Sequence, residues 1–292
     1  MADAAIARSE PLSRPRAGHI VDVLIEERAP KLSGSPAWPV LRPLLYRLLG
    51  YDRARRMADA IAPMEGRAAL EFVSDLLGID VVVSGLQHLP RQGRLIIVGN
   101  HPTGIADGVA VYDALKGARP DIIFYANSDA HRVCPKFDET LIPVEWVPAK
   151  RTRDRTRLTL TMTRAVMEAE RALMVFPAGK LARRDRNGVL TDPVWMPTAV
   201  SVAVKYEAPI IPVHVEGPWA TLFHFFDRFS PELRDITLFH ELLNKSGRRF
   251  TVTIGRPIAP ETLDGDAAVA SAAIKAYVER TLPFDPDRPF QS

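Results

Sequence analysis

The sequence predicts an α/β fold, in which a mostly parallel mixed sheet is flanked by helices and preceded by an N-terminal helical extension. From residue 79 onward, short apolar runs alternate with longer amphipathic segments, which is typical of strand–helix–strand units. Before that point, apolar residues recur at helical spacing, as at Val21, Leu24 and Ile25. With 292 residues and 47% hydrophobic content, the chain is long enough to bury a large core.

Four segments follow from this change of pattern. Residues 1–19 are small, polar and Pro-containing, and we expect a disordered or extended tail. Residues 20–78 are expected to form a helical, membrane-facing segment, and residues 79–282 the α/β domain. The Pro-containing residues 283–292 are expected to form a C-terminal tail.

The N-terminal segment carries an apolar stripe interleaved with arginines. The stripe consists of Trp38, Leu41, Leu45 and Leu48, with Arg42 and Arg47 between them. Such a stripe either lies in the interface of a bilayer or packs on the α/β core, and the pattern supports both equally. Pro39 and Pro43 limit this helix, so its firm part is expected after Pro43.

Seven short apolar runs in the α/β domain are expected to be strands. They are Val81–Val83, Leu95–Val98, Ile122–Ala126, Leu141–Val147, Leu173–Phe176, Ile210–Val215 and Phe250–Ile254. Five segments between or after them are expected to be helices. They are Gly108–Leu115, Arg155–Ala172, Pro197–Tyr206, Pro231–Leu243 and Ala267–Arg280. Ligand sites in open α/β sheets lie beyond the carboxyl ends of the strands, so the loops after residues 98 and 176 are the first candidates for chemistry.

Composition and motif searches exclude several classes of protein. The formal net charge of +3 does not suggest a nucleic-acid binder, and the single cysteine, Cys134, excludes an intrachain disulfide and fits a reducing compartment. No run approaches the ~18 apolar residues of a membrane-spanning helix, and the N-terminus lacks the layout of a secretory signal. We therefore expect a cytoplasmic protein or one bound to the cytoplasmic face of a membrane. Gly-x-Ser-x-Gly, His-Glu-x-x-His and Gly-x-Gly-x-x-Gly are all missing, which weighs against a serine-elbow hydrolase, a zinc site and a dinucleotide-binding loop.

The stretch from Asn100 to Gly108 places one histidine and one aspartate on a loop between a strand and a helix. A neutral imidazole at His101 is able to take a proton from a hydroxyl, and the carboxylate of Asp107 is able to orient that imidazole. In the alternative interpretation, Asn100 is a turn residue and Asp107 caps the N-terminus of the helix that follows.

Three further segments carry candidates for substrate binding. In Phe176–Arg183, Gly179 allows close approach of a ligand, and Lys180 and Arg183 offer positive charge, although a solvated turn has the same composition. Lys150 and Arg151 precede a helix N-terminus, where an anion binds readily, although a lid has the same composition. The last segment, Pro209 to His214, is expected to be a buried strand, with His214 directed to the other face of the sheet.

These four segments, in this order and spacing, resemble the glycerolipid (lysophospholipid) acyltransferase superfamily. That family carries an Asn-His-x4-Asp block, an Arg-containing block, a Phe-Pro-Glu-Gly-Thr-Arg block and a Pro-rich strand. The five residues between His101 and Asp107 are shared with the bacterial hemolysin-like branch and its relatives in ornithine-lipid synthesis. Glu241–Lys245 and Ile254–Ile258 resemble the same branch, and the resemblance covers about residues 70 to 260.

The resemblance implies a glycerol-3-phosphate acyltransferase-like fold and a set of site residues. His101 is implied as the catalytic base and Asp107 as its charge partner. The implied substrate-binding residues are Asn100, Lys150, Arg151, Phe176, Gly179, Lys180 and Arg183. Ala178 stands where the family has glutamate and Lys180 where it has threonine, and that glutamate is associated with seating the glycerol-phosphate acceptor.

The implied activity is transfer of a fatty acyl group from an acyl thioester, acyl-ACP or acyl-CoA, to the hydroxyl of a lysophospholipid or a lyso-aminolipid such as lyso-ornithine lipid. No acyl-enzyme, no metal and no cofactor beyond the thioester substrate are implied. The expected partners are acyl carrier protein or a coenzyme A thioester, the lysolipid, and the inner face of the cytoplasmic membrane as a peripheral binding surface. Two alternatives stay open: a non-catalytic lipid- or carrier-protein-binding protein, and a thioester hydrolase.

Overall fold

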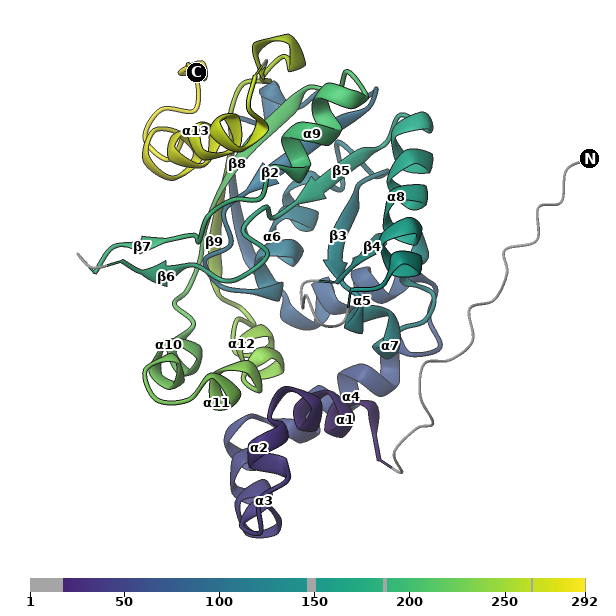
Figure 1. Cartoon of the computed structure of the whole chain (residues 1–292), viewed down its shortest axis with the longest axis vertical. Coiled ribbons are helices and arrows are strands. Elements are labelled where there is room, and N and C mark those ends of the chain that lie inside the picture. Colours follow the sequence, from purple (N-terminus) through teal and green to yellow (C-terminus); the bar gives the residue numbers. More distant parts are fainter. Residues whose placement is uncertain (1–17, 146–150, 186–187, 264, 292) are drawn as a thin grey trace, which may run out of the picture.

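The computed structural model describes residues 18–145, 151–185, 188–263 and 265–291. Nearly all of the predicted N-terminal tail and the candidate Lys150 lie outside these residues. Within them, one central sheet is covered by helices on both faces, and the N-terminal helices lie at one end of the molecule (Figure 1). The predicted α/β class with an N-terminal helical extension is confirmed.

The main sheet contains all seven predicted strands among the described residues. They are β1 (Asp80–Ser84), β2 (Leu95–Gly99), β3 (Ile123–Asn127), β4 (Leu141–Val144), β5 (Ala172–Val175), β8 (Ile210–Glu216) and β9 (Arg249–Ile254). Their order is β1-β9-β8-β2-β5-β3-β4. Every neighbouring pair is parallel except β8 and β9, so the sheet is mostly parallel and mixed, as predicted. The carboxyl ends of β2, β5 and β3 therefore meet at one edge.

The apolar residues of the central strands serve two separate cores. Alternate residues of β2, Leu95 and Ile97, belong to the core beneath the N-terminal helices and α6 (Ile105–Leu115). Ile96 and Val98 belong to the core beneath α8 (Arg153–Glu168), α9 (Thr198–Lys205) and α13 (Ala267–Arg280). All four side chains are buried, which explains why this strand reads as a continuous apolar run.

The N-terminal segment forms five helices within the described residues. They are α1 (Ile20–Arg28), α2 (Pro30–Ser33), α3 (Trp38–Leu48), α4 (Tyr51–Ile61) and α5 (Gly66–Leu77). The expectation that α3 becomes firm only after Pro43 is wrong, because the helix begins at Trp38 and runs through Pro43. Pro39 lies in the first turn, where backbone N–H groups have no helical partner, and Pro43 removes a single hydrogen bond.

The apolar stripe on α3 is divided between the core and the surface. Trp38 is buried and Leu45 packs against the core, whereas Leu41 and Leu48 are exposed. Val40 and Leu44 add to this outer face and are 79% and 67% exposed. Among the described helices, none is both long and apolar enough to cross a membrane.

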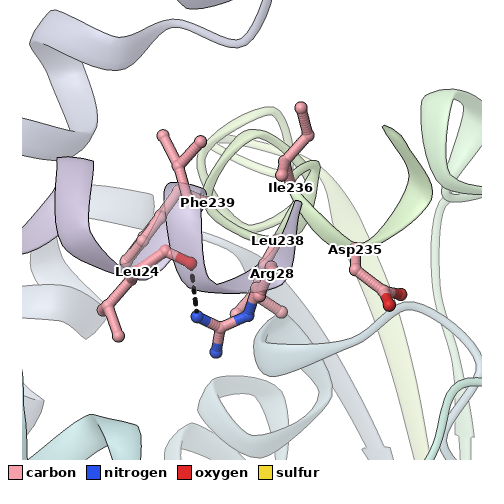
Figure 2. Close-up of a pocket in the computed structure, with 7 residues that line it drawn as sticks. Leu24, Arg28, Asp235, Ile236, Leu238 and Phe239 are labelled. Carbon is pink, nitrogen blue, oxygen red and sulfur yellow. Dashed lines mark hydrogen bonds between the residues drawn. The ribbon is translucent and has the colours of Figure 1, made fainter. Parts of the chain in front are cut away.

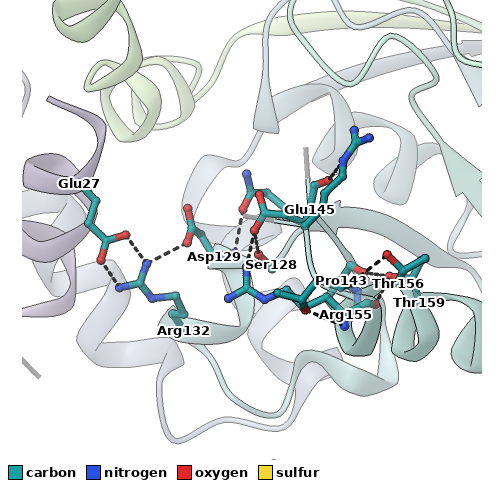
Figure 3. A network of polar contacts seen from close by, with 12 residues as sticks. Glu27, Ser128, Asp129, Arg132, Pro143, Glu145, Arg155, Thr156 and Thr159 are labelled. Atoms are coloured by element: carbon teal, nitrogen blue, oxygen red, sulfur yellow. Dashed lines mark hydrogen bonds and ion pairs between the residues drawn. The ribbon is translucent and has the colours of Figure 1, made fainter. Parts of the chain in front are cut away.

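Helix α1 is tied to the body of the protein by ion pairs. Arg132 of α7 (Asp129–Val133) binds both carboxylate oxygens of Glu27 at 2.8 and 2.9 Å, as Figure 3 shows, and Asp129 lies 2.7 Å from Arg28. In the same network, Arg155 at the start of α8 lies 2.7 Å from Glu145. These contacts fix the N-terminal helices against the carboxyl edge of the sheet.

The opposite side of α1 meets α11 (Pro231–Asp235) and α12 (Leu238–Leu243). Figure 2 shows this junction, where Leu24 and Phe239 face each other and Arg28 donates to the backbone oxygen of Leu24 at 3.0 Å. The crevice between them has no interior volume, so it holds no ligand.

Several local expectations are wrong. The predicted helix Arg155–Ala172 ends at Glu168, because Ala172 already begins β5. The predicted helix Pro231–Leu243 is divided into α11 and α12 at Thr237, whose hydroxyl donates to the carbonyl of Arg234 at 2.7 Å and competes with the helical pattern. Several short elements are not predicted by the sequence pattern. They are α7, α10 (Thr221–Asp227) and the hairpin of β6 (Arg183–Arg184) and β7 (Leu190–Thr191).

Candidate active site

The loop after β2 is fastened to the neighbouring strand β8 by Asn100. Its side-chain nitrogen donates to the carbonyl oxygen of Val215 at 2.9 Å, and its side-chain oxygen accepts from the Val215 N–H at 2.7 Å. Asn100 is buried, and both ends of its amide are engaged by backbone. The expected substrate contact of Asn100 is therefore replaced by a role in holding the loop.

His101 and Asp107 come together at the end of this loop. His101 Nδ1 lies 2.9 Å from Asp107 Oδ2, although the approach does not have the linear geometry of a hydrogen bond. The Asp107 carboxylate is fully buried and accepts from the N–H groups of Thr103 and Gly104 at 2.9 and 3.0 Å, and from the Thr103 hydroxyl at 2.6 Å. These donors and the positive end of α6 compensate the burial of its negative charge.

Gly104 has an unusual backbone conformation in the loop between His101 and Asp107. This glycine has a φ of +104°, a backbone conformation that L side chains rarely adopt, and α6 begins directly after it. Asp107 is the third residue of α6, so the helix starts at Ile105 and not at Gly108, and its N-cap residue is Gly104. Asp107 nevertheless caps the helix, because its carboxylate accepts from the Gly104 N–H at 3.0 Å. The Asp107 carboxylate therefore lies between the N–H groups of Thr103 and Gly104 on one side and the His101 imidazole on the other.

The imidazole of His101 is held from a second direction by Phe176. The two rings are stacked, with centroids 4.5 Å apart and planes 24° apart. They are brought together because β2 and β5 are parallel neighbours, with Val98 opposite Val175. The His101 side chain is 17% exposed and lines a cavity. When Nδ1 carries the proton toward Asp107, Nε2 is the nitrogen that accepts one.

The backbone of His101 is bonded on both sides by the segment around the small hairpin. Its N–H donates to both oxygens of Asp192 at 3.0 and 3.2 Å, and its carbonyl accepts from the Ala182 N–H at 2.8 Å. Burial raises the pKa of Asp192 to about 6. Sequence reasoning missed Asp192, which lies 91 residues from His101 and belongs to no motif.

The cavity beside His101 has a volume of about 340 Å³, which falls within the range of small-molecule sites. Its walls come from the N-terminal helices, α6, α12 and the carboxyl ends of β3 and β5. Most of the lining is apolar: Leu24, Met57, Ile61, Leu70, Val73, Ile105, Val109, Phe124, Val133, Phe137, Leu141, Phe176, Leu181, Leu238, Phe239 and Leu242. Such a cavity fits a hydrocarbon chain better than a polar ligand.

The remaining candidates divide into two groups. Phe176, Gly179 and Lys180 line the cavity with His101. Arg183 and Arg151 are not among the described residues that line it. Arg183 lies on β6, 3.9 Å from Asp227 of α10, and Arg151 donates to the carbonyl of Glu145 at 3.1 Å. Arg151 is thus not brought to the cavity beside His101, and Lys150 lies outside the described residues, so its role in anion binding stays a prediction.

The Glu241–Lys245 motif has a structural explanation. The two side chains form a buried ion pair at 2.9 Å. Glu241 also accepts from the N–H groups of Leu222 and Phe223 in the first turn of α10, and Lys245 donates to the carbonyl of Trp219 at 3.2 Å. The motif therefore fixes the segment that leaves β8 and passes the His101 loop.

No cluster of three or more possible metal-ligating side chains occurs in the part of the chain that the structure describes. The candidate chemistry rests on the pairing of the His101 imidazole with the buried Asp107 carboxylate beside an apolar cavity. This arrangement supplies a proton acceptor and its orienting partner.

Comparison with known proteins agrees with this chemistry. A family model described as Acyltransferase matches residues 80–216, which include both His101 and Asp107. Two curated relatives are each named lyso-glycine lipid O-acyltransferase. The relative from Phocaeicola vulgatus is 28% identical over 205 residues, covering 67% of this chain and 70% of the relative. The relative from Bacteroides thetaiotaomicron is 27% identical over 251 residues, covering 84% and 89%.

The fold has a solved counterpart. The 1-acyl-sn-glycerophosphate acyltransferase PlsC from Thermotoga maritima is similar in structure with a TM-score of 0.50, over 91% of this chain and all of that one, at 14% sequence identity. At this identity the likeness concerns the fold alone. Together with the motif order, the matched family model and the two curated relatives support the resemblance seen in the sequence to the glycerolipid (lysophospholipid) acyltransferase superfamily.

Proposed function

We propose that the protein is a lysolipid O-acyltransferase that moves an acyl group from an acyl thioester to a lysolipid hydroxyl, with His101 as general base. The observation that carries the proposal is the His101–Asp107 pair, 2.9 Å apart, at the wall of an apolar cavity. Neither residue alone suggests this chemistry, but their pairing beside a space for a hydrocarbon chain does.

In the proposed reaction, Nε2 of His101 takes the proton of the acceptor hydroxyl while Asp107 stabilises the charged imidazole. The acceptor oxygen attacks the thioester carbonyl carbon, the bond from carbon to sulfur breaks, and the thiolate takes the proton back from His101. The products are the acylated lipid and the free thiol. No covalent acyl-enzyme is formed, and the thioester is a substrate rather than a resident cofactor.

The acceptor is proposed to be a lyso-aminolipid. Both curated relatives are named for lyso-glycine lipid, and Ala178 of this chain is buried where the family has a glutamate. The acyl chain is proposed to lie in the cavity, where Lys180 supplies positive charge. Arg183 lies outside the cavity lining, and its contact with the acceptor stays a proposal. The donor is proposed to be acyl-ACP or acyl-CoA, because the mechanism needs only a thiolate leaving group.

The working site is proposed to be a membrane surface. Val40, Leu41, Leu44 and Leu48 form an exposed apolar face on α3. Arg42 and Arg47 on the same helix suit the anionic head groups of a bilayer. A lysolipid drawn from the bilayer then reaches the His101 loop without leaving the neighbourhood of the membrane.

The test uses labelled acyl-ACP and acyl-CoA with lyso-glycine lipid, lyso-ornithine lipid or lysophosphatidate. New diacyl lipid supports the proposal, release of free fatty acid supports a hydrolase, and binding without either product supports a non-catalytic protein. His101→Ala is expected to abolish transfer. His88→Ala is the matched control, because His88 lies 3.0 Å from Asp287 in a histidine–aspartate pair outside the cavity lining. Near-normal transfer by His101→Ala contradicts the mechanism.

A further inference from the structure

We propose that Asp192 is a positioning residue for His101: its buried carboxylate, supported by α13, sets the backbone of His101 and through it the approach of the imidazole to Asp107. The inference rests on the proposed function, since it assigns His101 the role of base. Asp192 touches no reacting atom and acts through the main chain of His101.

The carboxylate of Asp192 accepts hydrogen bonds from His101 and from Trp195. The His101 N–H donates to both carboxylate oxygens, and Trp195 Nε1 donates to Oδ2 at 2.8 Å. Asp192 itself is 4% exposed. Burial of a carboxylate costs considerable free energy. We infer that Asp192 is buried beside the His101 N–H because the position of the His101 backbone must be fixed closely.

The hairpin of β6 and β7 holds His101 at two points. Ala182, directly before β6, donates to the His101 carbonyl, and Asp192, directly after β7, accepts from the His101 N–H. Both polar groups of the His101 main chain are thus bound by the two ends of one hairpin. A shift of the hairpin moves the histidine, whereas Asp107 stays fixed by α6.

Helix α13 supports the hairpin end. Glu279 accepts from the Asp192 N–H at 2.7 Å and from the Thr191 hydroxyl at 2.8 Å. Lys275, one turn earlier, donates to Glu279 at 2.7 Å and to the Thr191 hydroxyl at 2.8 Å. A continuous chain of polar contacts therefore runs from the C-terminal helix through Asp192 to the proposed base.

The charge of Asp192 matters in addition to its shape. His101 and Glu279 are the titratable neighbours that act on Asp192 electrostatically. Lys275 pairs with Glu279 at 2.7 Å, and Glu279 also acts on the partly buried His214 of β8. Because burial raises the pKa of Asp192 to about 6, its carboxylate takes a proton just below neutral pH. The protonated acid accepts less strongly from the His101 N–H, so the hold on His101 weakens there.

The test compares Asp192→Asn with Asp121→Asn in the full chain. Asp121 is a stringent control, because it also accepts a backbone N–H, that of Ala172 at 3.1 Å, and in addition binds the buried Arg119 at 2.6 and 2.8 Å, but lies at the amino end of the sheet. Asp192→Asn is expected to lower kcat by about 10- to 100-fold with KM for the thioester nearly unchanged. The kcat of the natural protein is expected to fall as the pH drops below about 6, and Asp192→Asn is expected to lack this fall. Asp121→Asn is expected to leave kcat and the pH profile as they are.

A second readout does not depend on turnover. The nitrogen NMR signals of the His101 ring are expected to show one tautomer, protonated on Nδ1, in the natural protein and a mixture in Asp192→Asn. This separates the two proposals: absence of transfer by the natural protein overturns the function, whereas an unchanged ring signal in Asp192→Asn overturns the positioning role. If Asp192→Asn does not fold, Glu279→Gln serves instead, with a kcat several-fold lower expected, and an unchanged kcat contradicts the inference.

Discussion

The phenyl ring of Phe176 stacks on the imidazole of His101, with the ring centroids 4.5 Å apart. The two residues are 75 positions apart in the sequence, yet each follows a strand of the same parallel pair. The imidazole is therefore confined between an apolar ring and a buried carboxylate. Its orientation depends on the sheet as much as on its own loop.

Loss of the ring stack is expected to slow the reaction modestly. Aromatic pairs contribute about 0.5–1.5 kcal/mol beyond their buried area, so Phe176→Leu is expected to lower kcat/KM by about 2- to 10-fold. Steady-state kinetics with the acyl thioester measure this. Phe284→Leu is the control, because Phe284 is 85% exposed. An unchanged kcat/KM for Phe176→Leu argues against any role for the stack.

Replacement of Asp107 by asparagine is expected to harm both activity and stability. Oδ2 of the carboxylate accepts from the N–H groups of Thr103 and Gly104, and Oδ1 accepts from the Thr103 hydroxyl, so asparagine replaces the acceptor at one of these positions by an NH2 donor and removes the charge. Loss of a charge-assisted hydrogen bond costs about 1–3 kcal/mol, and loss of the orienting charge is expected to reduce kcat by about 10²- to 10⁴-fold. Urea unfolding and steady-state kinetics measure the two effects. Thr103→Val, which removes only the hydroxyl donor, is the milder comparison.

The raised pKa of Asp192 makes the stability of the fold depend on pH. Its pKa of about 6 in the folded protein exceeds the ~3.9 of an unfolded aspartate, so the folded state binds the proton more tightly. The stabilisation from this group is fully present below pH ~3.9 and is lost as the pH rises through about 6. The expected loss is about 3 kcal/mol. The free energy of unfolding, measured with urea from pH ~4 to ~7.5, is expected to decline in this way in the natural protein and not in Asp192→Asn. The same pH dependence in both proteins contradicts the prediction.

Filling the apolar cavity is expected to change the preferred acyl chain. Leu70 of α5 lines the cavity, so Leu70→Trp shortens the space available to a hydrocarbon chain. We expect activity with long-chain donors to fall by at least about tenfold, while a donor several methylenes shorter retains most of its rate, since each buried methylene contributes ~0.8 kcal/mol. A series of acyl thioesters measures this. Leu160→Trp is the control, because Leu160 is 61% exposed on α8. A uniform loss at every chain length excludes the cavity as the acyl site.

The outer face of α3 is expected to bind membranes. Charged side chains at Val40 and Leu44 oppose insertion, so the double change Val40→Asp and Leu44→Asp is expected to weaken binding to anionic vesicles by about tenfold or more. Vesicle flotation measures this. Val194→Asp is the matched control, because Val194 is 82% exposed and lies outside α3. Equal flotation of both proteins favours a surface other than α3.

The central strands β2 and β5 could be predicted from the sequence because their side chains are buried on both faces. Ile96 and Ile97 face opposite cores, so no polar residue interrupts the run between Leu95 and Val98. Helices were less well predicted where tertiary contacts decide their ends. The division at Thr237 depends on a hydroxyl–carbonyl bond, and α10 depends on the Glu241 carboxylate, which binds its first N–H groups from another helix.

Within the candidate site, the sequence indicates the residues that belong to motifs. It does not indicate the residues outside the motifs that hold them in position. His101 and Asp107 are close in the chain, so a motif captures both. Asp192 is 91 positions from His101 in the sequence and belongs to no motif, and only the parallel sheet and the hairpin bring the two residues together. Arg151 illustrates a limit of charge density as a guide, because it binds the carbonyl of Glu145 and is not among the described residues that line the cavity.

The edge strand β1 has a consequence for how the chain folds. Its register pairs Asp80 with Arg249, and these two residues are 169 positions apart. The strand partner of β1 therefore leaves the ribosome long after β1 itself. Until then the N-terminal helices are attached to an unfinished sheet, and pairing across so long a loop is slow. We infer that removal of the region from β9 onward leaves two strand edges open, at β1 and β8, and makes the truncated chain prone to aggregate.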